Sequence, residues 1–279
     1  MSPVNRYRWH RLLQSCDLDP SRLEEPLDEP GADDFIICGC PRSGTSLLAG
    51  MLFQPPASVV AMEPWDGLRL EPAQLFDSLR TEIEAGVMRR GRLDVAALEG
   101  EGRVAWVRDS EQTVPLVVDH GFRLGVKWPA FWRYLDLLPN TRFLVCVRDP
   151  VQVISSMAGT GGRLAAGYDY EVAFNRDMNT HLRAATDQPS IRRALLYEYV
   201  NSRIVPHLTD ANVKVVRYER WYEDPDMLLS EVGEFLGLEG LEPRVRLRPP
   251  IPVKQRERIE PLIERYCPSA MQLGYPVAT

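Results

Sequence analysis

The sequence predicts an α/β protein with three layers, in which helices flank a central parallel β-sheet in an arrangement of the P-loop type. Three observations support this fold class. Short apolar runs with little polar alternation recur along the chain, as in strands that are buried on both faces of a parallel sheet. Segments with helical spacing separate these runs, which indicates βαβ units. The first run also leads into a glycine-rich turn and then a helix-like stretch.

The apolar runs and the segments between them give the expected order of elements. Strands are expected at 35–39, 58–62, 122–126, 142–147 and 213–217. Helices are expected at 45–53, 72–86, 110–119, 130–138, 150–158, 169–187, 191–208, 224–236 and 256–266. Because ligands of open parallel sheets bind beyond the carboxyl ends of the strands, the residues that follow each strand are the first candidates for a functional site.

Length, charge and cysteine content bound the class of protein. The 279 residues suit one domain, 1–279, in which 1–34 form an N-terminal helix near 5–14 and an acidic, proline-rich linker. A net charge of −6 disfavours nucleic acid and membrane surfaces as partners. No run of about 18 apolar residues and no secretion signal is evident. Five cysteines without metal-type spacing indicate reduced thiols, as in a cytoplasmic protein.

The turn after the first strand reads GCPRSGTS over 39–46, which predicts an anion-binding loop. Glycines let backbone N–H groups turn inward, and the following helix directs the positive end of its dipole at the same place. The loop has Thr45 and Ser46 where an ATP- or GTP-binding loop has Lys followed by Ser or Thr. Hydroxyl groups and Arg42 would supply the remaining contacts. An ordinary strand–turn–helix junction with a serine N-cap is the alternative interpretation.

A second candidate anion site follows the strand at 142–147. Arg148 lies at the expected strand end, and Pro150 suits the first turn of the next helix, where a missing N–H has no cost. Ser156 lies about two turns further along that helix. The arginine and the hydroxyl could together hold a second phosphate group. A salt bridge beside a helix start is the alternative for this motif taken alone.

Two anion sites on one sheet indicate a nucleotide with phosphates on opposite sides of its ribose. Here the sequence resembles the sulfotransferase family that uses 3′-phosphoadenosine 5′-phosphosulfate (PAPS). The resemblance covers roughly 35–275 and rests on the segments PRSGTS, RDPVQVISS, VVRYERWYEDPDMLLSEVGEFLGL and CPSAMQLGY, in that order. The last segment is similar to the ending of the tyrosylprotein sulfotransferase branch and its bacterial relatives.

The resemblance implies which residues would bind PAPS. It assigns the 5′-phosphosulfate to the loop residues Arg42, Ser43, Gly44, Thr45 and Ser46. It assigns the 3′-phosphate to Arg148 and Ser156, and it places Tyr218 near the adenosine. A phosphosulfate has no γ-phosphate for a P-loop lysine to reach, so neither that lysine nor a metal ion is expected.

Catalysis is expected to depend on Glu63, Lys127 and Arg42. Glu63 comes directly after the strand 58–62, where several branches of the resembled family have a catalytic Glu, so we expect it to be the general base. The phenol and steroid branch instead has a His after a Lys-Thr pair. Here the matching stretch is Lys-Trp-Pro-Ala, which favours Glu63. Lys127 follows the next expected strand and could bind the transferring sulfonate. A loop carboxylate and a surface lysine are the alternatives.

The rest of the chain is less informative. In relatives a late basic loop covers the 3′-phosphate, and Lys254 is the candidate here, beside Arg256 and Arg258. The segments 65–121 and 158–200 match no motif and are expected to form the acceptor site, where His181 is a further candidate. Eight aromatic residues in and near these segments could line an apolar pocket, with two or three of them touching acceptor: Trp65, Trp106, Trp128, Phe131, Trp132, Tyr168, Tyr170 and Phe174.

The sequence therefore predicts an enzyme that moves a sulfonate group from PAPS to a hydroxyl group. The acceptor is expected to be a small molecule or natural product, and the protein a bacterial cytoplasmic enzyme, since it is rich in Arg and has only three Lys. One alternative is a P-loop kinase or nucleotide hydrolase with a degenerate loop. Another is a nucleotide-binding module without catalysis. Phenol, sugar and peptide tyrosine all remain open as acceptors.

Overall fold

A computed structural model of the protein describes residues 18–19, 23, 27–88, 114–245, 247, 252–253 and 256–276. Two expectations, the N-terminal helix near 5–14 and the role of Lys254, lie outside the described residues. Among the described residues, no helix combines the length and the apolar character that crossing a membrane requires.

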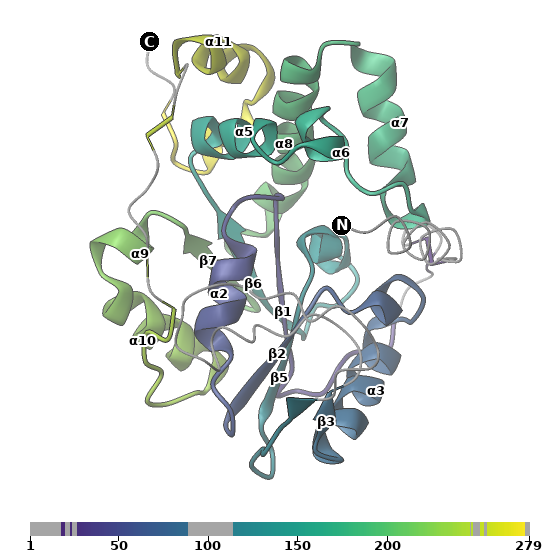
Figure 1. The fold of residues 1–279 in the computed structure, drawn as a ribbon, viewed down its shortest axis with the longest axis vertical. Coiled ribbons are helices and arrows are strands. Elements are labelled where there is room, and N and C mark those ends of the chain that lie inside the picture. Colours follow the sequence, from purple (N-terminus) through teal and green to yellow (C-terminus); the bar gives the residue numbers. More distant parts are fainter. Residues whose placement is uncertain are drawn as a thin grey trace.

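A five-stranded sheet forms the centre of the molecule, in the order β2-β5-β1-β6-β7 (Figure 1). The strands are β1 (Phe35–Gly39), β2 (Ser58–Met62), β5 (Arg123–Lys127), β6 (Arg142–Val147) and β7 (Val213–Arg217). Every neighbouring pair is parallel. The fold class and all five strands are confirmed, with β5 one residue later than expected. Their apolar runs are buried on both sides, which is why they show little polar alternation.

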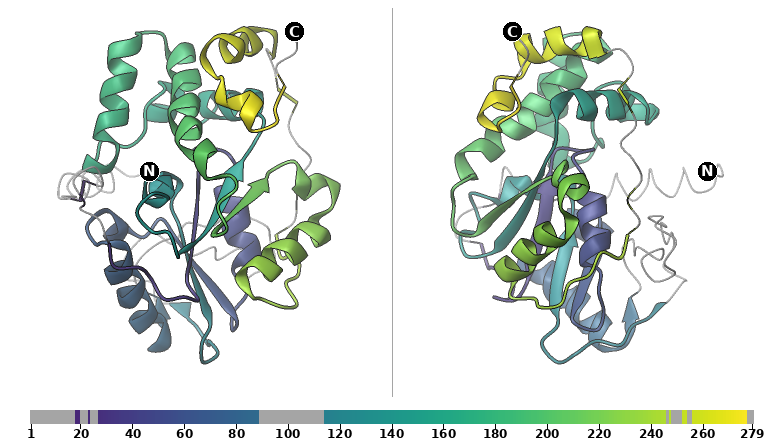
Figure 2. Two further views of the ribbon diagram at one scale, coloured as in Figure 1. Left: turned by 180° about the vertical axis from the view of Figure 1, so that it is seen from behind. Right: turned by 90° about the vertical axis from the view of Figure 1, so that its left-hand side faces the viewer.

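Helices cover both faces of the sheet, and alternate residues of each strand supply the two cores (Figure 2). Phe35 and Ile37 of β1 face a cluster formed with α2 (Thr45–Leu52), α9 (Arg220–Glu223) and α10 (Pro225–Leu236). Ile36 and Cys38 face the larger cluster. That cluster includes side chains of α3 (Pro72–Glu84), η3 (Pro129–Tyr134), α5 (Pro150–Ala158), α7 (Arg176–Ala185), α8 (Pro189–Ile204) and α11 (Arg256–Tyr266).

The helix expected at 110–119 is wrong in its described part. Val114–Pro115 form a short strand, β4, which pairs antiparallel with β3 (Val87–Met88), and no helix follows at 116–119. Proline cannot donate to a helical ladder, and the neighbouring valines favour extended backbone. The segment expected as a helix at 130–138 contains the shorter 3₁₀ helix η3.

The helix expected at 169–187 begins only at Arg176. Before it come the short helix α6 (Gly162–Ala165), a loop at 166–172 and the 3₁₀ turn η4 (Ala173–Asn175). Two side chains hold this loop. The Asp169 carboxylate accepts from the N–H of Tyr170, and the Asn179 amide donates to the carbonyls of Asp169 and Tyr170. Such bonds compete with helical ones, and the helical pattern in the sequence does not reveal them.

Parallel strands bring their carboxyl ends to one edge of the sheet, and the backbones there pack closely. Gly39 ends β1 with φ near 140°, and a Cβ added to it would lie 2.4 Å from the carbonyl oxygen of Cys146 in the neighbouring strand β6. The turn after β1 can therefore form only because residue 39 has no side chain.

We expect Gly39→Ala to lower the free energy of unfolding by roughly 3 kcal/mol, because it combines a backbone clash with a disfavoured φ. Gly121→Ala is the matched control. Gly121 also has a positive φ, of 80°, but an added Cβ there meets nothing within 4 Å. We expect the control to cost about 1 kcal/mol in urea denaturation. Equal losses would show that the clash with β6 contributes nothing.

Candidate functional site

The loop that follows β1 places the first turn of α2 at a pocket beside the carboxyl edge of the sheet. Gly44 is the N-cap of α2, with φ near 105°, and no side chain caps this helix end. Gly44, Thr45 and Ser46 line the pocket, so the positive end of the helix lies at its wall. The hydroxyl oxygen of Ser43 is buried and has no hydrogen-bond partner among the described residues. Anion binding by this loop stays a prediction, with a helix N-terminus and hydroxyl groups at the place where it needs them.

Two arginines lie together beside this cradle. Arg42 Nε donates to Ser156 Oγ at 3.0 Å, and Arg148 Nη1 donates to the backbone oxygen of Arg42 at 3.2 Å. Burial and the charge of Arg148 lower the pKa of Arg42. Neither guanidinium has a carboxylate partner among the described residues; Arg148 instead bonds Gln152. Two adjacent positive charges without a counter-charge are the electrostatic requirement for binding an anion.

Tyr218 connects the two arginine-bearing segments. The Arg148 guanidinium lies 3.8 Å from the centre of the Tyr218 ring, a cation–π contact. The same ring covers the loop so closely that a Cβ on Gly44 would lie 2.5 Å from one of its carbons. Two features therefore require glycine at position 44: the positive φ, and the Tyr218 ring, which leaves no room for a side chain.

Glu219, the next residue, joins the end of the chain to the site. One of its carboxylate oxygens accepts from the backbone N–H of Asp149 at 2.9 Å, just before α5. The other accepts from the Tyr275 hydroxyl at 2.8 Å. Arg256 of α11 also pairs with Asp149, at 3.3 Å. Glu219 therefore links the start of α5 to Tyr275, which follows the C-terminal helices; Figure 1 shows α5 beside α11.

Glu63 and Lys127 form an ion pair in the wall of the same pocket. Lys127 Nζ lies 2.6 Å from Glu63 Oε1, and the lysine is almost wholly buried. The backbone N–H of Glu63 donates to the Lys127 carbonyl at 2.7 Å, one residue past the paired strand ends. Glu63 also has a positive φ of 51°. Strained backbone of this kind, which costs about 1–3 kcal/mol, is concentrated at functional sites.

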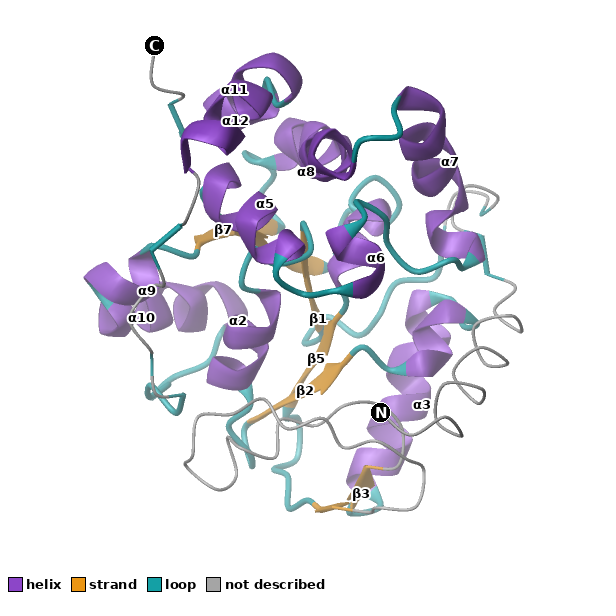
Figure 3. Ribbon diagram, turned by 45° about the horizontal axis from the view of Figure 1, so that its top comes forward, coloured by secondary structure: helices purple, strands orange, loops and turns teal. Residues whose placement is uncertain are grey.

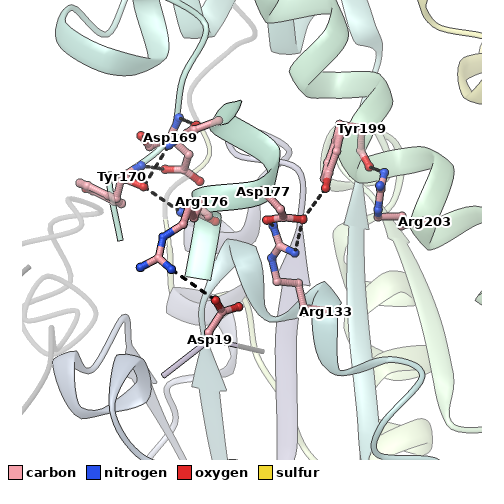
Figure 4. A network of polar contacts seen from close by, with 10 residues as sticks. Asp19, Arg133, Asp169, Tyr170, Arg176, Asp177, Tyr199 and Arg203 are labelled. Carbon is pink, nitrogen blue, oxygen red and sulfur yellow. Dashed lines mark hydrogen bonds and ion pairs between the residues drawn. The ribbon is translucent and has the colours of Figure 1, made fainter. Parts of the chain in front are cut away.

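A third ionisable group in this pocket was missed by sequence reasoning. Asp169, on the loop before α7, lines the pocket together with Glu63 and Lys127. Burial raises its pKa to about 6, and the charge of Glu63 adds to the effect. Figure 4 shows the loop with Asp169 and Tyr170 beside the start of α7. The only sequence signal was its place between two tyrosines in a segment expected to bind acceptor.

The pocket itself has a volume of about 320 Å³. Apart from the residues above, its walls are Pro41, Trp128, Pro129, Leu164 and Tyr170. It lies where the loop after β1, α6 and the carboxyl ends of β1, β2 and β5 converge (Figure 3). The wall therefore combines three cationic side chains, two carboxyl groups, and aromatic and aliphatic surface.

The other candidates are divided between the pocket and the rest of the molecule. Of the eight aromatic residues, Trp128 and Tyr170 line the pocket, Phe131, Trp132 and Phe174 are buried in the core, and Tyr168 packs against the core partly buried. Trp106 and the side chain of Trp65 lie outside the described residues. His181 packs against Tyr199 and is absent from the pocket wall. In the described part of the chain, no group of three or more His, Cys, Asp and Glu side chains is arranged to hold a metal.

The raised pKa of Asp169 predicts a stability cost that grows with pH. The folded protein binds this proton more tightly than the unfolded chain, whose carboxyl titrates near 3.8. Stability from this group is therefore present at low pH and lost as pH rises through about 6. We expect the free energy of unfolding of Asp169→Asn, relative to that of wild type, to increase by about 2 kcal/mol when the pH is raised from about 4.5 to about 7.5. Urea denaturation at the two pH values measures it.

Asp187→Asn is the control for this measurement, because the Asp187 side chain is fully exposed. Its difference from wild type should be the same at both pH values. A pH-independent difference for Asp169→Asn would mean that the Asp169 carboxyl titrates normally.

Comparison with known proteins places the chain in a family. The profile described as "Sulfotransferase family" matches residues 34–243. The nodulation protein NoeE of Sinorhizobium fredii is 29% identical over 222 residues, which are 73% of this chain and 50% of NoeE. The chain therefore spans about half the length of this curated relative.

Solved sulfotransferases are similar to the chain at low identity. A sulfotransferase from Alicyclobacillus acidocaldarius is 17% identical with a TM-score of 0.46, and covers 88% of this chain and 95% of its own. The sulfotransferase domain of the curacin biosynthetic pathway is 17% identical with a TM-score of 0.43, covering 91% and 100%. A mouse sulfotransferase complexed with PAP, SULT7A1, is 16% identical with a TM-score of 0.38, covering 84% and 66%. By the match to three quarters of its length, the chain belongs to the sulfotransferase family.

Proposed function

We propose that the protein transfers a sulfonate group from PAPS to a hydroxyl group of a small molecule. The observation that carries the proposal is one pocket lined by Arg42 and Arg148, which have no carboxylate partner among the described residues, and by the Glu63–Lys127 ion pair. The first pair suits a dianionic donor, and the second suits proton removal and charge stabilisation. Family membership supplies the type of group that is transferred.

The donor-binding residues would divide between two phosphate positions. The N–H groups at the start of α2 and the hydroxyls of Thr45 and Ser46 suit the 5′-phosphosulfate. Arg148 suits the 3′-phosphate, with the Tyr218 ring beside it. Ser156 was expected to bind this phosphate directly, and in the structure its hydroxyl accepts from Arg42. Ser156 would therefore also position Arg42 between the two phosphate sites.

The acceptor-side residues would supply the chemistry. The acceptor oxygen attacks sulfur and forms an S–O bond, the bond from sulfur to the phosphate oxygen breaks, and that oxygen leaves with the electron pair. Glu63 accepts the acceptor proton, since it lies in the pocket that Trp128 and Tyr170 line. Lys127 stabilises negative charge on the sulfonate or the leaving oxygen as the bond breaks, as does Arg42. Lys127 is desolvated, which strengthens its interaction with a developing charge.

The function is tested by calorimetric titration of the protein with 3′,5′-bisphosphoadenosine (PAP) and, in parallel, with ATP and magnesium. We expect metal-independent binding of PAP and much weaker binding of ATP. The reverse preference would contradict the proposal and would favour a nucleotide kinase with a degenerate loop. This experiment needs no knowledge of the acceptor.

Arg148→Ala should weaken PAP binding by about 10–100-fold, because a charged hydrogen bond to a phosphate is lost. Its effect on AMP, which has no 3′-phosphate, should be within a few fold. Calorimetry with both ligands gives the comparison. Arg203→Ala, on the far side of α8, is the matched control and should change neither affinity. Equal losses for PAP and AMP would refute the assignment of Arg148 to the 3′-phosphate.

Glu63→Gln should lower the rate of sulfonate transfer by about 10²–10⁴ while PAP affinity stays within a few fold of wild type. The amide can still bond Lys127 but cannot accept the acceptor proton. Transfer is followed with ³⁵S-labelled PAPS, and PAP affinity by calorimetry. A variant with the wild-type rate would show that Glu63 is not the base.

A further inference from the structure

The Glu63–Lys127 pair creates a chemical problem for the proposed reaction. A carboxylate that accepts a hydrogen bond from a lysine ammonium at 2.6 Å is stabilised in its charged form. Such a carboxylate has little affinity for a further proton, yet a general base must take one up. Something in the site must offset the lysine charge while Glu63 acts.

Asp169 is the other carboxyl group in the wall of this pocket. Burial raises the pKa of Asp169, and the negative charge of Glu63 raises it further. The repulsion between two carboxylates is mutual, so an ionised Asp169 makes proton uptake by Glu63 more favourable. Asp169 therefore acts on Glu63 in the direction opposite to Lys127.

The other charged or ionisable groups near Asp169 do not cancel this effect. The charges of Arg133 and Arg163 also reach Asp169 and lower its pKa. Each of these arginines is bound to a different carboxylate: Arg133 to Asp177 at 2.8 Å, as Figure 4 shows, and Arg163 to Glu171 at 3.2 Å. The remaining neighbour, the buried Cys40 thiol, has a pKa raised well above its usual value and stays neutral. Glu63 is thus the carboxylate whose negative charge raises the pKa of Asp169.

The loop is built to keep this carboxyl in place. Tyr170 N–H donates to Asp169 Oδ1 at 2.8 Å, and the Asn179 amide oxygen accepts from the Asp169 N–H at 3.1 Å. Asn179 is wholly buried, and its NH₂ group bonds the carbonyls of residues 169 and 170. Burial of a carboxyl group is costly, because desolvation penalises its charge, and such groups in pockets are candidates for a function.

We propose that Asp169 is a positioning residue of the reaction site, which keeps Glu63 basic while Lys127 is bound to it. This inference rests on the proposed function. When the acceptor proton moves to Glu63, the repulsion between the two carboxylates is relieved, and Lys127 is released to follow the charge on the sulfonate. Asp169 acts in its ionised form. The rate of sulfonate transfer should therefore rise with pH as Asp169 loses its proton, near pH 6.

The test compares wild type with Asp169→Asn, which keeps an oxygen for the Tyr170 N–H and removes the charge. The reaction followed is release of ³⁵S-sulfate from labelled PAPS in single turnover, with water as the acceptor, between about pH 5 and pH 8. We expect a rate about tenfold lower above pH 6.5 and loss of the rise near pH 6, with PAP affinity unchanged. An unchanged pH profile would overturn the proposal.

Asp177→Asn is a second variant, because it leaves Asp169 in place and frees Arg133 from its partner. The unmasked positive charge should move the rise in rate toward lower pH. Asp187→Asn is the control and should leave the profile as in wild type. A profile in Asp177→Asn that matches this control would contradict the proposal, even if Asp169→Asn folds poorly.

A titration without turnover provides an independent measurement. The ¹³C carboxyl signal of Asp169 is followed against pH in wild type and in Glu63→Gln. We expect the midpoint near 6 in wild type and a lower midpoint in the variant, because a like charge is lost. An unmoved midpoint would show that the carboxyls do not interact. Failure of the proposed function is distinguished, since it would appear as absent PAP binding in wild type.

Discussion

The ion pair between Glu63 and Lys127 depends directly on the hydrogen bonding of the sheet. β2 and β5 run parallel with Met62 beside Lys127, and the N–H of Glu63 adds one more bond to the Lys127 carbonyl. The two side chains then leave the strand ends at the same level and meet at 2.6 Å. Because the lysine is buried, a counter-charge beside it is required, since an unpaired buried charge is costly. The register between β2 and β5 therefore determines whether the ion pair can form.

The pocket wall combines cationic and acidic side chains in a way that suits group transfer. Arg42 and Arg148 are adjacent, lie beside the N-terminus of α2 and lack acidic partners among the described residues. Glu63, Asp169 and Lys127 line the same pocket as this cationic pair. An anionic ligand is attracted to the pair.

Most of the sheet and much of the site could be predicted from the sequence, because both depend on local patterns. Doubly buried strands need unbroken apolar runs, and Glu63, Lys127 and Arg148 follow such runs directly. The position of Asp169 could not be predicted, since tertiary bonds from Asn179 and Tyr170 hold its loop out of the helix that the sequence pattern suggests. Ser156 accepts a hydrogen bond from Arg42, which lies 114 residues away, and spacing in the sequence cannot reveal that bond.

The pair Arg42 and Arg148 also has a consequence for handling the protein. Two guanidinium groups that repel each other raise the free energy of the folded state, and any anion that enters between them lowers it. Sulfate or phosphate in a buffer should therefore act as a stabiliser and, at the same time, as a competitor of the nucleotide. A buffer with sulfate or phosphate would therefore prolong storage of the protein, and an assay in the same buffer would give too low an activity.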